Sequence, residues 1–118
     1  NTIKITFGGS AISYATGPYI LNLLDASTNS GIQVNTQWDQ NNSVWTATFN
    51  PQYTISAGTT KSFKVRTDST GFINNASSSD TFALTIMSTG DVSWTDGSGT
   101  FGLPSTVVPF TVSSVAYQ

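Results

Sequence analysis

The segment from Ile32 to Phe49, IQVNTQWDQNNSVWTATF, contains two alternating runs separated by a cluster of turn-forming residues. Every second residue of each run falls on one face: Ile32, Val34, Thr36 and Trp38 in the first run, and Trp45, Ala47 and Phe49 in the second. A period of two is typical of β-strands, and Asp and Asn favour tight turns. The segment therefore predicts a β-hairpin with its turn at Asp39-Gln-Asn-Asn42, and it is the strongest hairpin signal in the chain.

The same kind of pattern recurs along most of the chain. Further strands are expected at Thr2–Phe7, Tyr19–Leu24, Tyr53–Ile55, Ser62–Thr67, Thr81–Met87, Val92–Trp94, Thr106–Val112 and Ser114–Tyr117. Of these, Tyr19–Leu24 is a denser apolar run that fits either a strand covered on both faces or a short helical turn. Asp96-Gly97-Ser98-Gly99 is a strong turn signal, and Asp68–Asp80 is the longest loop.

These expectations define the fold class. About eight or nine short strands at intervals of roughly 8–14 residues, without helix signals, predict an all-β, two-sheet antiparallel β-sandwich with immunoglobulin-like or jelly-roll connections. A closed barrel is the second choice. No linker or internal repeat divides the chain, so residues 1–118 are expected to form one domain.

The composition does not favour catalysis. The chain contains no cysteine, histidine or glutamate, and only 8% of its residues are charged. Histidine, thiolates and paired carboxylates supply most acid–base, nucleophilic and metal chemistry, so we predict a protein that is not an enzyme and holds no cofactor or metal. Serine and threonine make up 36 of the 118 residues, and a hydroxyl-rich surface with few charges indicates an extracellular or cell-surface protein.

Charge also restricts the partners. The four cations are Lys4, Lys61, Lys64 and Arg66, and the net charge is −2. Nucleic-acid binding and attachment to anionic membranes both need clustered cations, so neither is expected. No apolar run approaches the length of about 18 residues that membrane insertion requires, and no signal-peptide pattern opens the chain.

The three tryptophans, Trp38, Trp45 and Trp94, are candidates for an aromatic platform that binds a sugar ring. Trp38 and Trp45 flank one hairpin and could face the same way. The alternative is that the indoles are core or sheet-edge residues, because tryptophan contributes a large apolar area to a sandwich.

Several polar residues were weighed as sites. Asp91 and Asp96 occur in an oxygen-rich segment that could hold calcium, but the spacing of a calcium loop is not complete, and a solvated turn is the simpler interpretation. Asp68 and Asp80 bracket the long loop and could cooperate with each other. Separately, any two of the aspartates could act as a glycosidase pair, although a chain with six acids offers little room for a deep cleft.

Two kinds of covalent modification were also considered. Lys4, Lys61 or Lys64 could form an isopeptide bond with an asparagine if a buried acid lay beside the pair. Asn41 and Asn75 stand in glycosylation-type sequences, which matter only in an organism that glycosylates its surface proteins.

The second half of the chain carries a resemblance. Its residues are ISAGTTKSFKVRTD (residues 55–68), Phe82-Ala-Leu84-Thr-Ile86 and Val92-Ser-Trp94-Thr-Asp96-Gly97. Together they resemble the Ser/Thr-rich, immunoglobulin-like β-sandwich modules of long surface proteins from uncultivated, small-genome bacteria. The resemblance covers residues 55–97 and implies a sandwich fold and a surface location. It implies no functional residue.

Two functions are therefore considered. The first is a structural subunit of a cell-surface filament, stalk or layer that associates with copies of itself or with neighbouring modules. Its assembly strand would be donated by Thr2, Ile3, Lys4, Ile5, Thr6 and Phe7, followed by the hinge Gly8-Gly9-Ser10. The alternative for this segment is pairing within its own sheet. The second function is a carbohydrate-binding module that uses exposed tryptophans.

Overall fold

The computed structural model describes residues 1–9, 20–68 and 80–117, and within these ranges the chain is almost entirely β-structure. The strands are β1 (Thr2–Gly8), β2 (Leu21–Asp25), β3 (Val34–Asp39), β4 (Val44–Phe49), β5 (Phe63–Thr67), β6 (Asp80–Ile86), β7 (Val92–Thr95), β8 (Thr100–Gly102) and β9 (Phe110–Tyr117). A short 3-10 turn, η2 (Thr89–Asp91), precedes β7.

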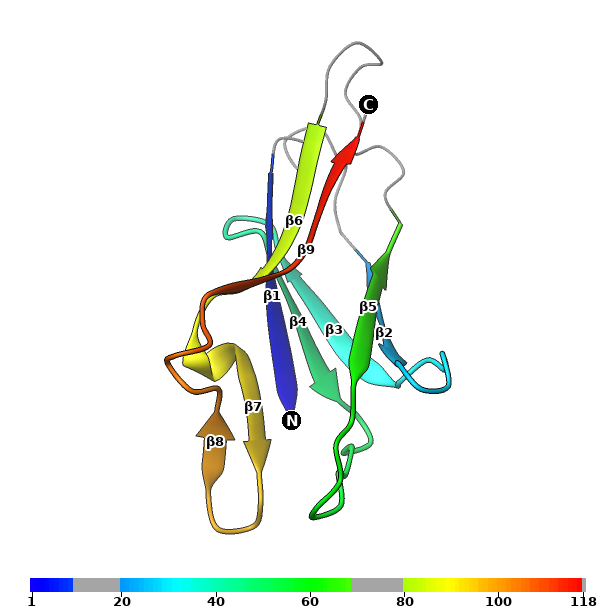
Figure 1. Cartoon of the computed structure of the whole chain (residues 1–118), viewed down its shortest axis with the longest axis vertical. Coiled ribbons are helices and arrows are strands. Elements are labelled where there is room, and N and C mark those ends of the chain that lie inside the picture. The colour runs from blue at the N-terminus through cyan, green and yellow to red at the C-terminus, as the bar shows by residue number, and fades with distance from the viewer. Residues whose placement is uncertain (10–19, 69–79, 118) are drawn as a thin grey trace.

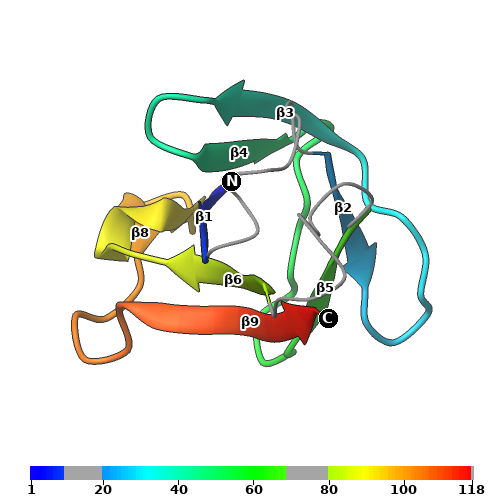
Figure 2. The ribbon, with the colours of Figure 1, turned by 90° about the horizontal axis from the view of Figure 1, so that it is seen from above.

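The strands form two antiparallel sheets. The larger sheet has the order β3-β4-β1-β6-β9, and the β7–β8 hairpin extends it beside the first residues of β1. The smaller sheet is the pair β2-β5. Seen from above, the larger sheet curves and the β2-β5 pair lies across its open side (Figure 2). The expected two-sheet sandwich is therefore confirmed, and the described strands form no closed barrel.

β1 occupies the centre of the larger sheet (Figure 1). Residues Thr2–Thr6 pair with β4 on one side, while the other side pairs with β7 at Thr2 and Ile3 and with β6 from Thr6 to Gly8. The predicted alternation is present, because Ile5 and Phe7 are buried and Lys4 is exposed. The segment proposed as a donor strand thus adopts the alternative arrangement, pairing within its own sheet.

Gly9 ends this strand in a conformation that only glycine accepts. Its φ is +104°, and a Cβ atom there would lie 2.2 Å from the carbonyl oxygen of Thr81. The glycine expected as part of a hinge instead allows the chain to pass close to the backbone beside β6. Ser10, the last residue of the expected hinge, lies outside the described residues.

The core lies between the two sheets. Its buried cluster combines residues of both sheets: Ile5, Phe7, Leu21, Trp45, Ala47, Phe82, Leu84 and Ile86. The β2 segment is a strand rather than a helical turn, and it is covered on both faces, because Leu23 is 2% exposed and Leu24 is 7% exposed. The chain that follows β2 provides the outer cover, through a bridge between Leu24 and Gly31.

The hairpin predicted from the Ile32–Phe49 segment is confirmed as β3 and β4, with Trp38 paired to Trp45. Asp39 holds its turn: one carboxylate oxygen accepts the backbone N–H groups of Asn41 and Asn42 at 3.0 and 3.2 Å. The side-chain amide of Asn42 donates to the other oxygen at 2.8 Å. Such turns are the usual role of Asp between two strands.

Three details of the strand prediction were wrong. Residues Tyr53–Ile55 form no strand, and β8 was not expected. The expected strand Thr106–Val112 begins only at Phe110, because residues 105–107 form a turn and Pro109 lies in a bend directly before the strand. Proline lacks the N–H that a strand ladder needs, which explains the late start.

Candidate functional site

The three tryptophans lie in different environments and do not form one platform: the alternative, a core position, holds for Trp45. Trp45 is 1% exposed and belongs to the core cluster. Trp38, its partner across the ladder, is half-buried and packs edge-on against Phe7, with ring centroids 5.2 Å apart. Only Trp94 is largely exposed, with 42% of its surface accessible.

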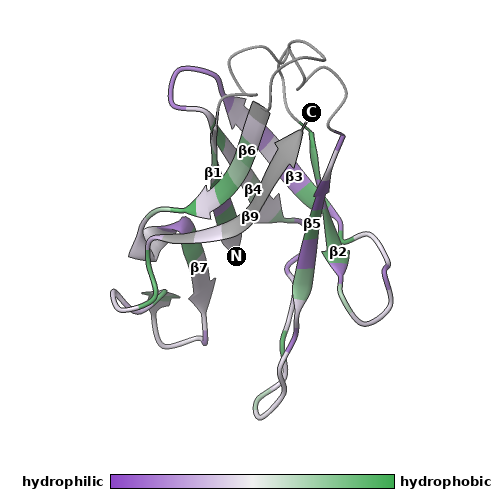
Figure 3. Ribbon diagram, turned by 45° about the horizontal axis from the view of Figure 1, so that its top comes forward, coloured by the Kyte–Doolittle hydropathy of each residue, from purple (hydrophilic) through white to green (hydrophobic). Residues whose placement is uncertain are grey.

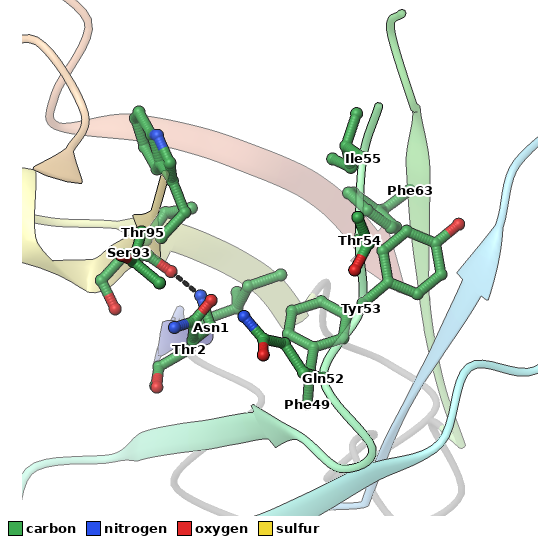
Figure 4. A pocket seen from close by; sticks show the side chains of 13 residues that line it. Asn1, Thr2, Phe49, Gln52, Tyr53, Thr54, Ile55, Phe63, Ser93 and Thr95 are labelled. Carbon is green, nitrogen blue, oxygen red and sulfur yellow. Dashed lines mark hydrogen bonds between the residues drawn. The ribbon is translucent and has the colours of Figure 1, made fainter. Parts of the chain in front are cut away.

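Trp94 belongs to the lining of a cleft at one end of the sandwich. Figure 4 shows this cleft, with Ser93 and Thr95 on one side and Tyr53 and Phe63 on the other. Two projections form its walls: the β7–β8 hairpin and the arm made by residues 50–62, which leaves β4 and returns to β5. Both project from the lower end of the molecule in Figure 1. The cleft between them has a volume of about 350 Å³.

The first wall continues the larger sheet. Ile3 pairs with Val92, and both side chains pack against the core. Two residues further along β7, Trp94 pairs with Phe101 of β8, and the two rings stack with centroids 6.3 Å apart and planes 25° apart. The backbone nitrogen of Asn1 donates to the carbonyl oxygen of Ser93 and fastens β1 to this hairpin. The orientation of the Trp94 indole is thus set by a ring partner and by a paired strand.

The second wall is an aromatic cluster. Phe49 at the end of β4, Tyr53 in the arm and Phe63 at the start of β5 have ring centroids 5.6–6.0 Å apart in all three pairs. Each ring is half-buried. Because three rings that support one another lose little freedom when a ligand binds, this wall is preorganised. Ile55 continues it outward and is 46% exposed.

The polar groups of the cleft are amides and hydroxyls. They come from the side chains of Asn1, Thr2, Gln52, Thr54, Ser93 and Thr95, and none of the residues that line the cleft carries a charged side chain. Residues 52–55 are extended but belong to no strand. No backbone hydrogen bond joins them to any other described residue.

Four aspartates, Asp25, Asp39, Asp91 and Asp96, form local hydrogen bonds, and none of them lines the cleft. One oxygen of Asp25 accepts the hydroxyl and backbone N–H of Ser27, and the other forms an ion pair with Lys61 at 3.2 Å. The Ser27 hydrogen bonds, and then Lys61, hold the pKa of Asp25 well below its usual range. Asp96 similarly accepts the hydroxyl and N–H of Ser98, which lower its pKa.

Asp91 and Asp96 cannot share a calcium ion. Asp91 caps η2 by accepting the backbone N–H groups of Met87 and Ser88, each at 3.0 Å. Asp96 follows β7, so the two residues lie at opposite ends of a strand, roughly 16 Å apart at about 3.3 Å per residue. Among the described residues, no three metal-ligating side chains gather in one place.

The remaining candidates are dispersed. Lys64 donates to the side-chain oxygen of Asn29 at 3.3 Å, but the lysine is exposed, so the buried environment that an isopeptide bond requires is missing. Lys4 is exposed on the outer face of the larger sheet. Asn41 is exposed in the β3–β4 turn, while Asn75 lies outside the described residues. Asp68 is exposed just before the undescribed segment, and Asp80 begins β6.

Sequence reasoning missed most of the cleft. The sequence pattern predicts a strand for Tyr53 and Ile55, and it puts Phe49 and Phe63 in two separate strands with no link between them. The available signal was the concentration of aromatic residues at both ends of the arm, next to the Asn50–Pro51 break.

Comparisons with protein-family models, with curated proteins and with solved structures found no match. In the part of the chain that the structure describes, no helix has the length and apolar character needed to cross a membrane. The site is therefore interpreted from its own geometry.

Proposed function

We propose that the chain is a non-catalytic, extracellular structural protein, whose copies join through the open edges of the larger sheet into a surface filament, stalk or layer. The observation that carries this proposal is strand β9. It spans eight residues, and it pairs with β6 on one side and with no described strand on the other.

β9 lacks the residues that usually protect such an edge. Its sequence, FTVSSVAY, contains no charge, proline or glycine. Edge strands of monomeric proteins commonly carry lysine or proline, or are kept very short, because an open edge is a template for another chain. One protective device is present: the register shifts between Leu84 and Thr85, which makes Val112 the extra residue of a bulge. The five residues from Ser113 to Tyr117 continue in regular register.

The larger sheet has a second open edge at β3. Within the described residues β3 pairs only with β4, and its single charge is Asp39 at the end of the strand. Pairing β9 of one copy with β3 of the next would continue the sheet from molecule to molecule. Because the two edges are different, this contact is head-to-tail and can be repeated without closing, which produces a filament.

β9 is a better assembly strand than the segment expected from the sequence. Thr2–Phe7 is hydrogen-bonded on both sides, so donating it to a neighbour would first break its pairing with β4, β6 and β7. β9 can accept another strand without leaving its own sheet. Strand addition of this kind takes most of its affinity from main-chain hydrogen bonds.

The surface supports an extracellular, structural role. Copies that carry a net charge of only −2 repel one another weakly, and hydroxyl and amide groups can bond across wide contacts. The strongly hydrophilic residues in Figure 3 stand out on β5, in the smaller sheet, and the sequence of β9 contains no charged residue. The resemblance over residues 55–97 to bacterial surface modules supports the same location.

The non-catalytic part of the proposal rests on the carboxylates. A general acid at neutral pH needs a raised pKa, but hydrogen bonds lower the pKa of Asp25, Asp39 and Asp96. Each of these groups stabilises a turn and faces no second carboxylate in a cleft. They act as capping groups rather than as an acid–base pair.

The test compares self-association of the natural chain with that of two variants. Ser114→Lys places a charge in the middle of β9, where residue 114 pairs with Ala83. Ser105→Lys makes the same change in an exposed turn before β9 and serves as the matched control. The assays are sedimentation velocity over a range of concentrations and negative-stain electron microscopy.

We expect filaments or concentration-dependent oligomers from the natural chain and from Ser105→Lys, and monomers from Ser114→Lys. A natural chain that stays monomeric at every concentration would overturn the proposal. Equal assembly of both lysine variants would exclude β9 as the contact, and assembly that stops at dimers would exclude the head-to-tail filament.

A further inference from the structure

The cleft between the β7–β8 hairpin and the 50–62 arm has the character of a ligand site that the structural role does not use. β9 does not line it, so assembly through the sheet edges leaves it open. We propose that this cleft binds an uncharged carbohydrate, with a sugar ring held between Trp94 and the aromatic wall that contains Tyr53.

The first argument is the aromatic surface. A pyranose ring presents patches of C–H groups, which pack on the electron-rich face of an indole or phenol ring. Trp94 combines 42% exposure with an orientation fixed by Phe101, and the cluster of Phe49, Tyr53 and Phe63 stands on the opposite wall. An exposed indole on one wall and half-buried rings on the other can together hold a flat apolar face that neither wall could hold alone.

The second argument is the polar lining. Sugar hydroxyls both donate and accept hydrogen bonds, and so do the amide of Gln52 and the hydroxyls of Thr54, Ser93 and Thr95. The backbone N–H and C=O groups of residues 52–55 have no backbone partner among the described residues. The cleft thus combines aromatic walls with amides, hydroxyls and backbone groups that have no backbone partner among the described residues. This combination matches a ligand that is apolar on its faces and polar at its rim.

The third argument concerns charge and size. The side chains that line the cleft carry no charge, so no side chain there balances a phosphate, sulfate or carboxylate group, and the α-amino group of Asn1 is already bonded to the carbonyl oxygen of Ser93. A charged ligand would lose its hydration without gaining an ion pair with a side chain. The volume of about 350 Å³ lies near the lower end of the range of ligand pockets, roughly 300–1,000 Å³, which suits a short stretch of a glycan.

The fourth argument is preorganisation. The cleft lies between two projections of a packed sandwich, and its two walls are tied by the β1–β7 pairing and by the aromatic cluster. Binding residues on loops held by a rigid scaffold are a common arrangement for recognition. An extended peptide could also lie along residues 52–55, but the paired aromatic walls and the hydroxyl rim favour the sugar.

The experiment uses the full chain and neutral probes. Trimers of β-1,4-linked glucose, β-1,4-linked N-acetylglucosamine and α-1,2-linked mannose are titrated while the three tryptophan indole N–H signals are followed by NMR. We expect at least one trimer to produce a saturable shift of the Trp94 signal and to leave that of the buried Trp45 unchanged. A sulfated trimer of the same linkage should bind at least tenfold more weakly.

Variants separate a binding role from a structural one. Because the Trp94 variants lack the indole signal, the affinities of all variants are measured by isothermal titration calorimetry. Trp94→Ala should lower the affinity at least tenfold, Trp94→Phe should restore part of it, and Gln52→Ala should lower it severalfold without changing the thermal midpoint. Ile20→Ala and Met87→Ala are the controls, because both residues are exposed and apolar but lie outside the cleft. Their affinity should equal that of the natural chain.

Three results would overturn the proposal. The first is the absence of a saturable shift with any neutral trimer. The second is affinity that survives in both Trp94→Ala and Gln52→Ala. The third is a shift of the Trp94 signal that an uncharged, extended peptide produces and that excess sugar does not reverse. This result would assign the cleft to a peptide. None of these results depends on whether the chain forms filaments.

Discussion

Replacing Ile5 by alanine tests whether β1 belongs to the core of its own domain. Ile5 is 1% exposed and lies between β4 and the other strands that flank β1. The substitution removes three buried carbon groups at about 0.8 kcal/mol each, or about 2.4 kcal/mol of transfer free energy. The cavity left in a packed core adds to this loss, so we expect a total of about 3–4 kcal/mol.

That loss is a large part of the free energy of unfolding of a domain of this size, which is about 5–15 kcal/mol. The thermal midpoint should therefore fall by about 10–15 °C. The assay is chemical denaturation followed by tryptophan fluorescence and far-UV circular dichroism. Its linear dependence on denaturant gives the free energy and the m-value.

The matched control is Lys4→Ala on the same strand. Lys4 is exposed and points away from the core, so its replacement should cost less than about 1 kcal/mol. If Ile5→Ala and Lys4→Ala lose the same small amount of stability with an unchanged m-value, β1 is not a central core strand. The donor-strand interpretation of Thr2–Phe7 would then regain its basis.

Three further predictions concern acid, a glycine and fluorescence. Because the pKa values of Asp25, Asp39 and Asp96 are lowered in the folded protein, their contribution to stability is complete above their unfolded pKa of about 4 and is lost as the pH falls through the folded values. With no histidine or glutamate, no side chain should change the free energy of unfolding between about pH 5 and 8, and the aspartates should lower it only in acid. Burial lowers the pKa of the Asn1 α-amino group, so this one group should make the free energy of unfolding rise slightly as the pH rises toward about 8. A midpoint of decline near about pH 6 in a pH series of denaturation curves, recorded with the α-amino group acetylated, would contradict this. Gly102→Ala should destabilise the protein by more than about 1 kcal/mol, since its Cβ would lie 2.3 Å from the carbonyl oxygen of Thr89. The control is Gly99→Ala, whose Cβ would lie 4.0 Å from its nearest neighbour and should be tolerated. Thermal denaturation compares the two variants. Acrylamide should quench mainly the fluorescence of Trp94, so the emission that remains in Trp94→Phe should be blue-shifted and weakly quenched. Emission quenched as strongly as in the natural chain would refute the claim that Trp94 is the exposed tryptophan.

The strand pattern could be predicted from the sequence wherever one face of a strand is buried. The alternation in Thr2–Phe7 and in Ile32–Phe49 identifies β1, β3 and β4, because their apolar residues face one core. The short β8 contains Phe101 between Thr100 and Gly102 and carries no periodic signal. It forms because the turn at Asp96-Gly97-Ser98-Gly99 returns the chain to β7, which is a property of the turn rather than of the strand.

The candidate site was predicted only in part. Trp94 was identified as a possible sugar-binding residue, but Trp38 and Trp45 were grouped with it because they flank the same hairpin. Their shared face is the inner one, and the sequence of a hairpin does not show which face the second sheet will cover. The contribution of Phe49, Tyr53 and Phe63 depends on contacts across the arm and between the sheets, which local sequence patterns do not report.

The most direct test of the central claim is residue-resolved hydrogen exchange of the natural chain, measured once in dilute, monomeric solution and once in the assembled state. If copies join through β9, backbone amides within residues 110–117 and on the partner edge β3 should gain protection on assembly, while those of β1 should be equally protected in both states. Assembly that protects neither edge, or that changes the protection of β1, would contradict the account.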